Sequence, residues 1–502
     1  MKRLLIILVL LTFISSVSST YAKAPFEGNS CQKLGQKRIY KKLEYKCERI
    51  SKKPIWVRIK VNSAKESSNP IPMPTPSPIP TTSPQPIPTP TTKSSEPNYQ
   101  ESSRRADPET CRLKDQRKNQ ELRLDHFERN NGFPLQGATL PTKGKLKLLS
   151  ILVDFPDALG TLEDLKMIRE QEKVMVAWFS EASQGKLTAE VITSDKWFRA
   201  PKASVEYELL PTQYGLHPKY AQEFIDLTGT SFNWDGVNAF MVHFPTSQKT
   251  KLQSAQLGRA VELNTPQGRK SLNYQYFGTL HIDFAKRVKD KNPDYLAGQW
   301  IHEHLHDLGL TLHAPGNGFY TGLGQNQGSY SQMLSAWELF KLDWLSDNQI
   351  FCTTVSEIEN TFVNLVPLEI FEKGNRAAIV VLDKSKALVI ESRRALGLSK
   401  RWPKDLSGIY VYQIDTSVDT DRTQEFNGSG LDNGNNRKFP KWAFYLDSDQ
   451  RPIDDSIPNN KVDPEKFYQD WLIRVGESVT TESVKIDFRK SDQTDWIEIT
   501  RN

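Results

Sequence analysis

Apolar residues follow two spacings along the chain, and these spacings predict the order of its secondary-structure elements. Nearly continuous apolar runs at 145–155 and 237–244 predict two buried strands. Apolar residues at helical spacing over 162–183 and over 295–308 predict two helices, and a third helix is predicted at 336–345. We therefore expect strands and helices to be mixed in the middle of the chain.

The pattern changes to short apolar runs after residue 353. Strands are predicted at 377–382, 387–391, 408–414, 471–475, 484–488 and 496–499. The chain has 502 residues and a globular composition, which allows a large core. The expected fold class is thus α+β, with a mixed domain at 105–352 followed by a β-rich C-terminal domain at 353–502.

Residues 1–22 have the three parts of a secretory signal peptide. Lys2 and Arg3 precede an apolar run, and small residues lead to Ala22, after which we expect cleavage. The run is too short to span a bilayer comfortably, and no other segment is suited to a transmembrane anchor. We expect a secreted protein, either extracellular or associated with the cell wall.

A small module at 23–62 and a linker at 63–104 are expected before the mixed domain. The module is rich in Lys and Arg and is too short to bury much apolar surface, so it needs a disulfide. It resembles the short cysteine-paired modules of many actinobacterial exported proteins. The linker is rich in Pro, Thr and Ser and predicts an extended spacer.

Four cysteines in an exported chain predict two disulfides. Cys31 and Cys47 bracket a short basic segment, and Cys111 and Cys352 bracket most of the mixed domain. We expect these two pairings, with free thiols as the alternative. The basic segment favours anionic cell-wall polymers or lipid head groups over nucleic acid as partners, and a solvated surface without a partner is the alternative.

The segment 302–306 carries the pattern H-E-x-x-H, and four of the eight histidines fall between His302 and His313. Residues four apart lie on one face of a helix, so His302 and His306 can bind one metal ion. Zinc held by two His and one further ligand lowers the pKa of a bound water to about 7. Glu303 is then placed as the general base of peptide-bond hydrolysis. The same pattern also occurs on helix surfaces that bind no metal.

The residues after this segment bear on the third ligand. Gly309 can adopt the left-handed conformation that ends a helix and turns the chain back. We expect His313 to be the third ligand, with Glu338 and Asp343 as competing candidates.

Four further residues in or after this segment have expected roles other than metal binding. His304 points away from the other two helix histidines, so we expect it to serve packing or a hydrogen bond. Asp307 is expected either to accept a hydrogen bond beside the ligands or to be an exposed acid. Tyr320 and Tyr330 are candidate donors to a tetrahedral oxyanion.

Several further segments form a set with the histidine segment. They are 153–157 (VDFPD), 178–187 (WFSEASQGKL), 302–310 (HEHLHDLGL), 334–345 (LSAWELFKLDWL), 388–394 (LVIESRR), 408–415 (GIYVYQID) and 475–480 (VGESVT). Taken together, these segments resemble the immune inhibitor A type of secreted metallopeptidase. The resemblance implies a metzincin-like zinc peptidase catalytic domain with an attached β-domain.

The resemblance also bears on single residues. Met333 stands where metzincins have the Met-turn beneath the zinc, and an ordinary core residue is the alternative. The third ligand of metzincins falls where this chain has Leu312, so His313 requires a bulge of one residue after Gly309. The family often has an Asp-rich calcium loop, but this chain has FNWDG at 232–236, so calcium is doubtful beside Zn²⁺.

We therefore expect a secreted zinc endopeptidase that acts on protein or peptide substrates. The alternative is a non-catalytic cell-surface binding protein that retains the fold. The basic module, the Pro-rich linker and the displaced third ligand favour this alternative, and the metal content of the purified protein distinguishes the two.

Overall fold

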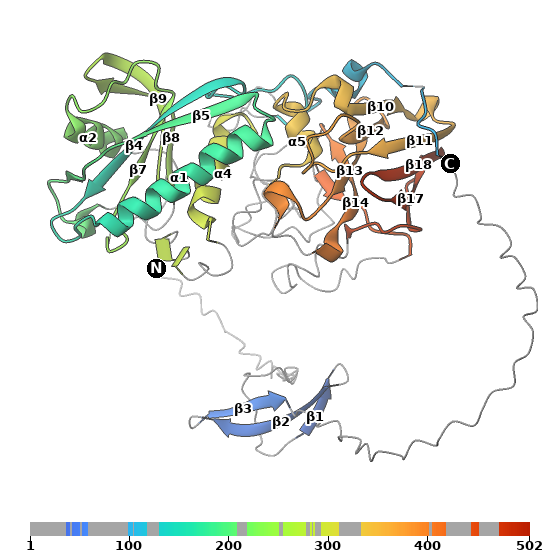
Figure 1. Ribbon diagram of the computed structural model, residues 1–502, viewed down its shortest axis with the longest axis horizontal. Coiled ribbons are helices and arrows are strands. Elements are labelled where there is room, and N and C mark those ends of the chain that lie inside the picture. The colour runs from blue at the N-terminus through green and yellow to red at the C-terminus, as the bar shows by residue number, and fades with distance from the viewer. Residues whose placement is uncertain are drawn as a thin grey trace, which may run out of the picture. The chain divides into compact units, whose positions relative to one another are not determined.

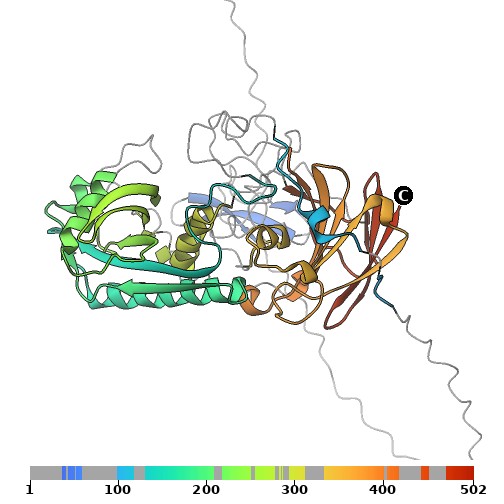
Figure 2. The same ribbon diagram turned by 90° about the horizontal axis from the view of Figure 1, so that it is seen from above.

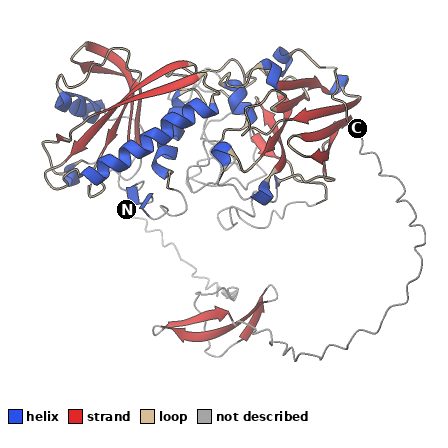
Figure 3. Ribbon diagram, in the orientation of Figure 1, coloured by secondary structure: helices blue, strands red, loops and turns tan. Residues whose placement is uncertain are grey.

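A computed structural model describes most of the chain after residue 98 and three strands before it. The described residues are 37–40, 43–50, 53–58, 99–103, 105–117, 130–207, 218–249, 255–277, 282–283, 285–286, 293–310, 333–400, 404–417, 443–450 and 471–502. The chain divides into two compact units, Met1–Lys93 and Ser94–Asn502 (Figure 1). The fold is mixed α+β, with several sheets and few helices among the described residues (Figure 3). The predicted signal peptide lies outside the described residues.

The first unit contains a three-stranded antiparallel sheet. Its strands are β1 (Lys37–Tyr40), β2 (Leu43–Ile50) and β3 (Lys53–Arg58), with β2 in the centre. Cys47 on β2 is buried. Its expected partner, Cys31, lies outside the described residues, so this pairing stays a prediction.

The second unit begins with a six-stranded sheet, here called the mixed sheet. Its strands are β4 (Gly144–Asp154), β5 (Leu187–Thr193), β6 (Phe198–Arg199), β7 (Ala239–His243), β8 (Ala255–Thr265) and β9 (Gly268–Phe277). The order is β5-β4-β7-β9-β8, and β6 pairs with the end of β4. The strands β5, β4, β7 and β9 are parallel, whereas β8 is antiparallel to β9. The structure confirms the two predicted strands as β4 and β7.

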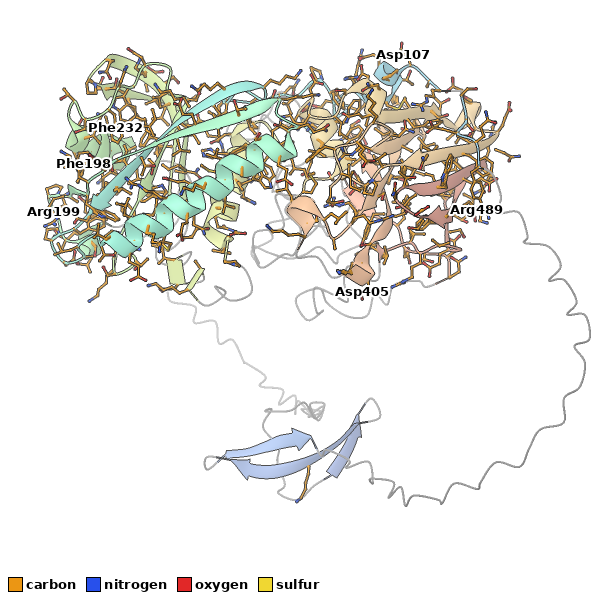
Figure 4. All side chains as sticks on the ribbon, viewed as in Figure 1. Asp107, Phe198, Arg199, Phe232, Asp405 and Arg489 are labelled. Atoms are coloured by element: carbon orange, nitrogen blue, oxygen red, sulfur yellow. A yellow bond between two sulfur atoms is a disulfide. The ribbon has the colours of Figure 1, made fainter. Side chains whose placement is uncertain are left out.

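Both faces of the mixed sheet are covered. The side chains of Leu146, Leu148 and Leu152 share one core with α1 (Leu162–Ala182) and α4 (Tyr295–Asp307). The alternate residues of β4 share a second, aromatic core with α2 (Pro218–Thr228). Figure 2 shows α1 lying along one face of the sheet, and Figure 4 marks Phe198 and Phe232 of the aromatic core, whose ring centroids are 6.2 Å apart. Burial on two faces explains the nearly continuous apolar run of β4.

The second half of this unit consists of two packed sheets, here called the C-terminal sandwich. One sheet has the order β10-β12-β13-β14-β15 and the other has the order β11-β18-β17-β16. The strands are β10 (Ile350–Thr354), β11 (Asn360–Leu365), β12 (Ala377–Val381), β13 (Lys386–Arg393), β14 (Gly408–Asp415), β15 (Ala443–Tyr445), β16 (Ser478–Thr480), β17 (Val484–Ser491) and β18 (Asp495–Arg501). An apolar core lies between the two sheets.

The predicted strand at 471–475 is wrong. Only Ile473 pairs there, through two hydrogen bonds between its backbone and that of Ile409. The chain then turns, because the Glu477 N–H donates to the Arg474 carbonyl and Gly476 has a φ of +88°. A turn so soon after one bridge leaves no room for a strand.

One core joins the mixed sheet to the C-terminal sandwich. Residues of α1, α4 and α5 (Ala336–Lys341) share it with the face of β12, β13 and β14 that points away from the second sheet of the sandwich. The predicted helix at 336–345 is shorter than expected, because Asp343 has a φ of +59° and the Trp344 N–H donates to the Leu339 carbonyl. Short 3₁₀ turns complete the structure: η1 (Pro108–Cys111), η2 (Ser204–Glu206), η3 (Asp347–Gln349), η4 (Val355–Glu357), η5 (Gly397–Ser399) and η6 (Lys404–Leu406).

The segment before the mixed sheet is attached to the C-terminal sandwich. The predicted disulfide between Cys111 and Cys352 is present, and the Ala106 N–H donates to the Cys352 carbonyl at 2.8 Å. Asp107, marked in Figure 4, caps η1 by accepting a hydrogen bond from the Glu109 N–H. In the described part of the chain, no helix is both long enough and apolar enough to cross a membrane.

Candidate metal centre

The helix α4 carries the predicted metal-binding segment, and its two ends are fixed by different parts of the fold. At its start, Gln171 of α1 accepts a hydrogen bond from the Ala297 N–H at 3.0 Å and donates one to the Pro293 carbonyl at 2.9 Å. The apolar residues at helical spacing in and directly after α4 form one packed face and are all buried: Leu296, Ala297, Trp300, Ile301, Leu305 and Leu308. Burial of this face and a side-chain cap from α1 explain why the helix begins here.

The end of α4 is the turn that the sequence predicts. Gly309 has a φ of +96°. The Leu310 N–H donates to the Leu305 carbonyl, and the Gly309 N–H donates to the His306 carbonyl, both at 3.1 Å. These two bonds form a Schellman motif, which requires a left-handed residue at the position of Gly309. The chain therefore leaves the helix at Gly309, three residues after His306.

His302, Glu303 and His306 lie together on α4. One ligand atom from each of them falls within 4.8 Å of the others. The two imidazole rings are nearly perpendicular, with centroids 4.9 Å apart. His302 and His306 are 6% and 4% exposed, whereas Glu303 is partly exposed. The spacing of four residues thus brings both imidazoles to one place, as the sequence predicts.

The arrangement fits a bound metal ion. Imidazole nitrogens bind zinc at about 2.0–2.1 Å, so the His302 and His306 nitrogens, within 4.8 Å of each other, are close enough to share one ion. His306 Nδ1 lies 3.4 Å from the Leu310 carbonyl, so Nε2 is the nitrogen that would bind a metal. Within the described residues, these three side chains form the one group of three or more potential ligands. Nothing in the group distinguishes zinc from another transition metal that accepts imidazole.

The predicted third ligand, His313, lies outside the described residues, as do Tyr320 and Tyr330. The two other candidates for the third ligand, Glu338 and Asp343, are not part of the group formed by His302, Glu303 and His306. The Glu338 carboxylate is buried and accepts hydrogen bonds from the Ser335 N–H and hydroxyl, at 3.0 and 2.9 Å. Asp343 is 47% exposed and forms an ion pair with Lys143.

Glu338 has its own electrostatic environment. Its full burial raises its pKa to about 7, and the nearby Glu391 adds to the increase. Hydrogen bonds from Ser335 act in the opposite direction. The Glu338 carboxylate forms the capping box at the start of α5 and is not part of the cluster of His302, Glu303 and His306.

His304 lies on another side of α4 and belongs to a buried polar network. Its Nε2 accepts a hydrogen bond from Gln275 Nε2 at 2.7 Å, and its Nδ1 is 3.8 Å from Asp307 Oδ2. The structure confirms that His304 serves a hydrogen bond. Asp307 is also bound by Arg259, whose Nε lies 2.6 Å from Asp307 Oδ1.

Asp307 is not the exposed acid that the sequence allowed, since its side chain is 6% exposed. Burial acts to raise the pKa of Asp307, but the Arg259 guanidinium and His304 outweigh it, so this pKa lies below its ordinary value. Asp307 is thus ionised and paired with Arg259 and His304.

The roles of Arg259 and Gln275 were not predicted from the sequence. Both belong to the β8–β9 hairpin, which the turn sequence Thr265-Pro266-Gln267-Gly268 could have indicated. A hairpin alone would not have identified Arg259, because its contact with Asp307 depends on an irregularity within β8.

Met333 is 1% exposed and lies in the core that contains α4 and α5. Its carbonyl and that of Leu334 accept hydrogen bonds from Arg393 of β13, each at 3.3 Å. Arg393 is fully buried between Glu369 and Glu391, each at 2.9 Å. The C-terminal sandwich therefore holds the backbone of the segment that precedes α5.

Asp235, in the segment 232–236 where the family often has a calcium loop, forms an ion pair with Lys270 at 3.0 Å.

No model of a known protein family matches the chain, and no curated protein matches it closely enough to count as a relative.

Proposed function

We propose that this protein is a secreted zinc-dependent endopeptidase whose metal centre is formed by His302 and His306, with Glu303 as the general base. The observation that carries the proposal is the convergence of these three side chains on one helix, within 4.8 Å of one another. An H-E-x-x-H pattern on an irregular segment would not give this convergence, and one on an exposed helix would not bury both imidazoles as here.

The chemistry follows from the residue types. His302 and His306 would hold the zinc ion, which when bound would supply Lewis acidity toward the scissile carbonyl and would lower the pKa of a bound water to about 7. Glu303 would accept a proton from the water that attacks the carbonyl carbon. Glu303 then delivers this proton to the amine nitrogen as the C–N bond breaks. The hydrolysis proceeds without a covalent link to the protein.

His313 is proposed as the third ligand. It follows the left-handed turn at Gly309, which directs the chain away from the axis of α4. Glu338 and Asp343 are engaged elsewhere, which leaves His313 as the remaining candidate from the sequence.

The family proposal rests on the sequence resemblance to immune inhibitor A type metallopeptidases. It includes a metzincin-like catalytic domain, and Met333 below the metal as the Met-turn. A buried Met333 in one core with α4 supports this role. Export is proposed from the signal-peptide pattern of residues 1–22, and the disulfide between Cys111 and Cys352 supports it.

The test compares zinc content and cleavage of a denatured protein substrate in three variants of the full chain. Glu303→Gln is expected to keep zinc and to lose cleavage by at least about a hundredfold, because the proton acceptor is removed. Glu170→Gln, an exposed carboxylate on α1, serves as the matched control and should behave as wild type. His313→Ala is expected to lose zinc.

Three results would contradict parts of the proposal. Full cleavage by Glu303→Gln would exclude the general-base role. Zinc retained by His313→Ala would exclude this residue as a ligand. A folded wild-type protein that contains no zinc, cleaves nothing and binds cell walls would instead favour a non-catalytic surface protein.

A further inference from the structure

The strand β8 contains an irregularity beside the metal helix. Gly258 pairs with Tyr274 and Val261 pairs with Leu272, so Arg259 and Ala260 together lie opposite Asn273. Two residues opposite one define a β-bulge. Ala260 has a φ of +48°, and its N–H donates to Asn273 Oδ1 at 2.8 Å. A non-glycine residue in this conformation is uncommon and is held here by its surroundings.

The buried Asn273 fixes the bulge to a second segment. Its Nδ2 donates to Thr139 Oγ1 at 2.7 Å. The backbone N–H groups of Thr139 and Leu140 donate in turn to the Asp307 carbonyl, at 2.8 and 3.0 Å. The bulge and the segment before β4 therefore meet at the residue that follows His306.

The bulge also sets the position of Arg259. Its guanidinium, largely buried, reaches Asp307 Oδ1 at 2.6 Å. The C-terminal end of a helix carries a partial negative charge, and a buried carboxylate there is unfavourable without a cation. Arg259 supplies this cation. Asp307 is thereby bound through both its side chain and its carbonyl.

We propose that Arg259 is a positioning residue of the metal centre: presented by the β8 bulge, it holds the last turn of α4 through Asp307 and so fixes the His306 imidazole. This inference rests on the proposed metal-binding function of α4. Without Arg259, the buried Asp307 carboxylate loses its cation and moves toward water, and the turn that carries His306 moves with it. The effect on the metal is indirect, because Arg259 acts through Asp307.

The experiment replaces Arg259 in the full chain and uses two readouts. Arg259→Met keeps the length and apolar part of the side chain but removes the charge. Arg269→Met is the matched control on the same hairpin, because Arg269 pairs with Glu262 at 3.1 Å in an exposed position. Zinc affinity is measured by competition with a chromophoric chelator, and amide hydrogen exchange at 304–310 is measured in metal-free protein.

Arg259→Met is expected to weaken zinc binding by about tenfold, the lower end of the range for residues that orient metal ligands. Amide exchange at 304–310 should accelerate by about tenfold or more in the same variant, because this turn opens more often. Arg269→Met should change neither quantity. Arg259→Lys retains the charge without the planar guanidinium, so we expect an intermediate loss of affinity, and it replaces Arg259→Met if the latter does not fold.

The two readouts separate the failure of this inference from the failure of the proposed function. If wild-type protein binds no zinc, the proposed function is wrong, and the exchange data still decide whether Arg259 holds the end of α4. If Arg259→Met lowers the melting temperature but keeps wild-type zinc affinity and wild-type exchange at 304–310, Arg259 is only a structural residue and the inference is overturned.

Discussion

Gly309 offers a quantitative test of how tightly the end of the metal helix is packed. Its φ of +96° is unfavourable for any residue with a Cβ, and alanine in a left-handed conformation costs about 1–2 kcal/mol. A Cβ at this position would also lie 3.1 Å from the Gln136 carbonyl oxygen and 3.2 Å from side-chain carbons of Leu135 and Ala138. Such contacts force the neighbouring segment to shift, which costs a further ~1–3 kcal/mol. Gly309→Ala is therefore expected to lower the free energy of unfolding by about 2–5 kcal/mol.

The matched control is Gly229→Ala, directly after α2. Gly229 also has a positive φ, of +51°, but a Cβ there would meet nothing within 4 Å. This variant should show the backbone cost alone, about 1–2 kcal/mol. Urea unfolding of metal-free protein, followed by tryptophan fluorescence, gives both values. Equal destabilisation by the two substitutions would refute the argument that residues 135–138 press against Gly309.

Two further predictions concern buried groups away from the metal ligands. Because the pKa of Glu338 rises from 4.5 to about 7 in the folded protein, its stabilising contribution is complete below pH 4.5 and is lost as the pH rises to about 7. The unfolding free energy of Glu338→Gln, measured by urea unfolding, should therefore increase relative to that of wild type by up to about 3 kcal/mol as the pH rises across this window, and a difference that does not change with pH would contradict the assignment. The disulfide closes a separation of 241 residues, so Cys111→Ser with Cys352→Ser should lower the unfolding free energy by about 2–5 kcal/mol. An unchanged midpoint in non-reducing urea would show that the disulfide contributes nothing to stability.

Features that depend on local sequence could be predicted from the chain. The strand β4 and the helices α1 and α4 follow from apolar spacing, since each buries a continuous run or one face. The end of α4 follows from Gly309, because few other residues adopt its conformation. The convergence of His302 and His306 follows in turn from helical geometry alone.

Features that depend on distant contacts could not be predicted. Asn273 and Gln275 of β9 alternate with apolar residues, a pattern that predicts exposed polar side chains, but both are buried by contacts with distant segments. The role of Asp307 as the partner of Arg259 is also invisible in the sequence, because the two residues are 48 positions apart and meet only through the bulge. A buried ion pair leaves no periodic signal.

The contacts around α4 also determine which part of the chain has to be studied. Arg393 and Glu391 of β13 bind the backbone at Met333, Leu334 and Ala336. A fragment that ended at residue 352 would lack both side chains and the apolar face of β12–β14, and it would expose the core residues of α4 and α5 that pack with this face. The backbone before α5 would then lose its hydrogen-bond partners, and α5 would lose the surface that buries it. Because the metal helix shares this core, the C-terminal sandwich is a structural part of the candidate metal centre, and zinc affinity has to be measured on protein that retains it.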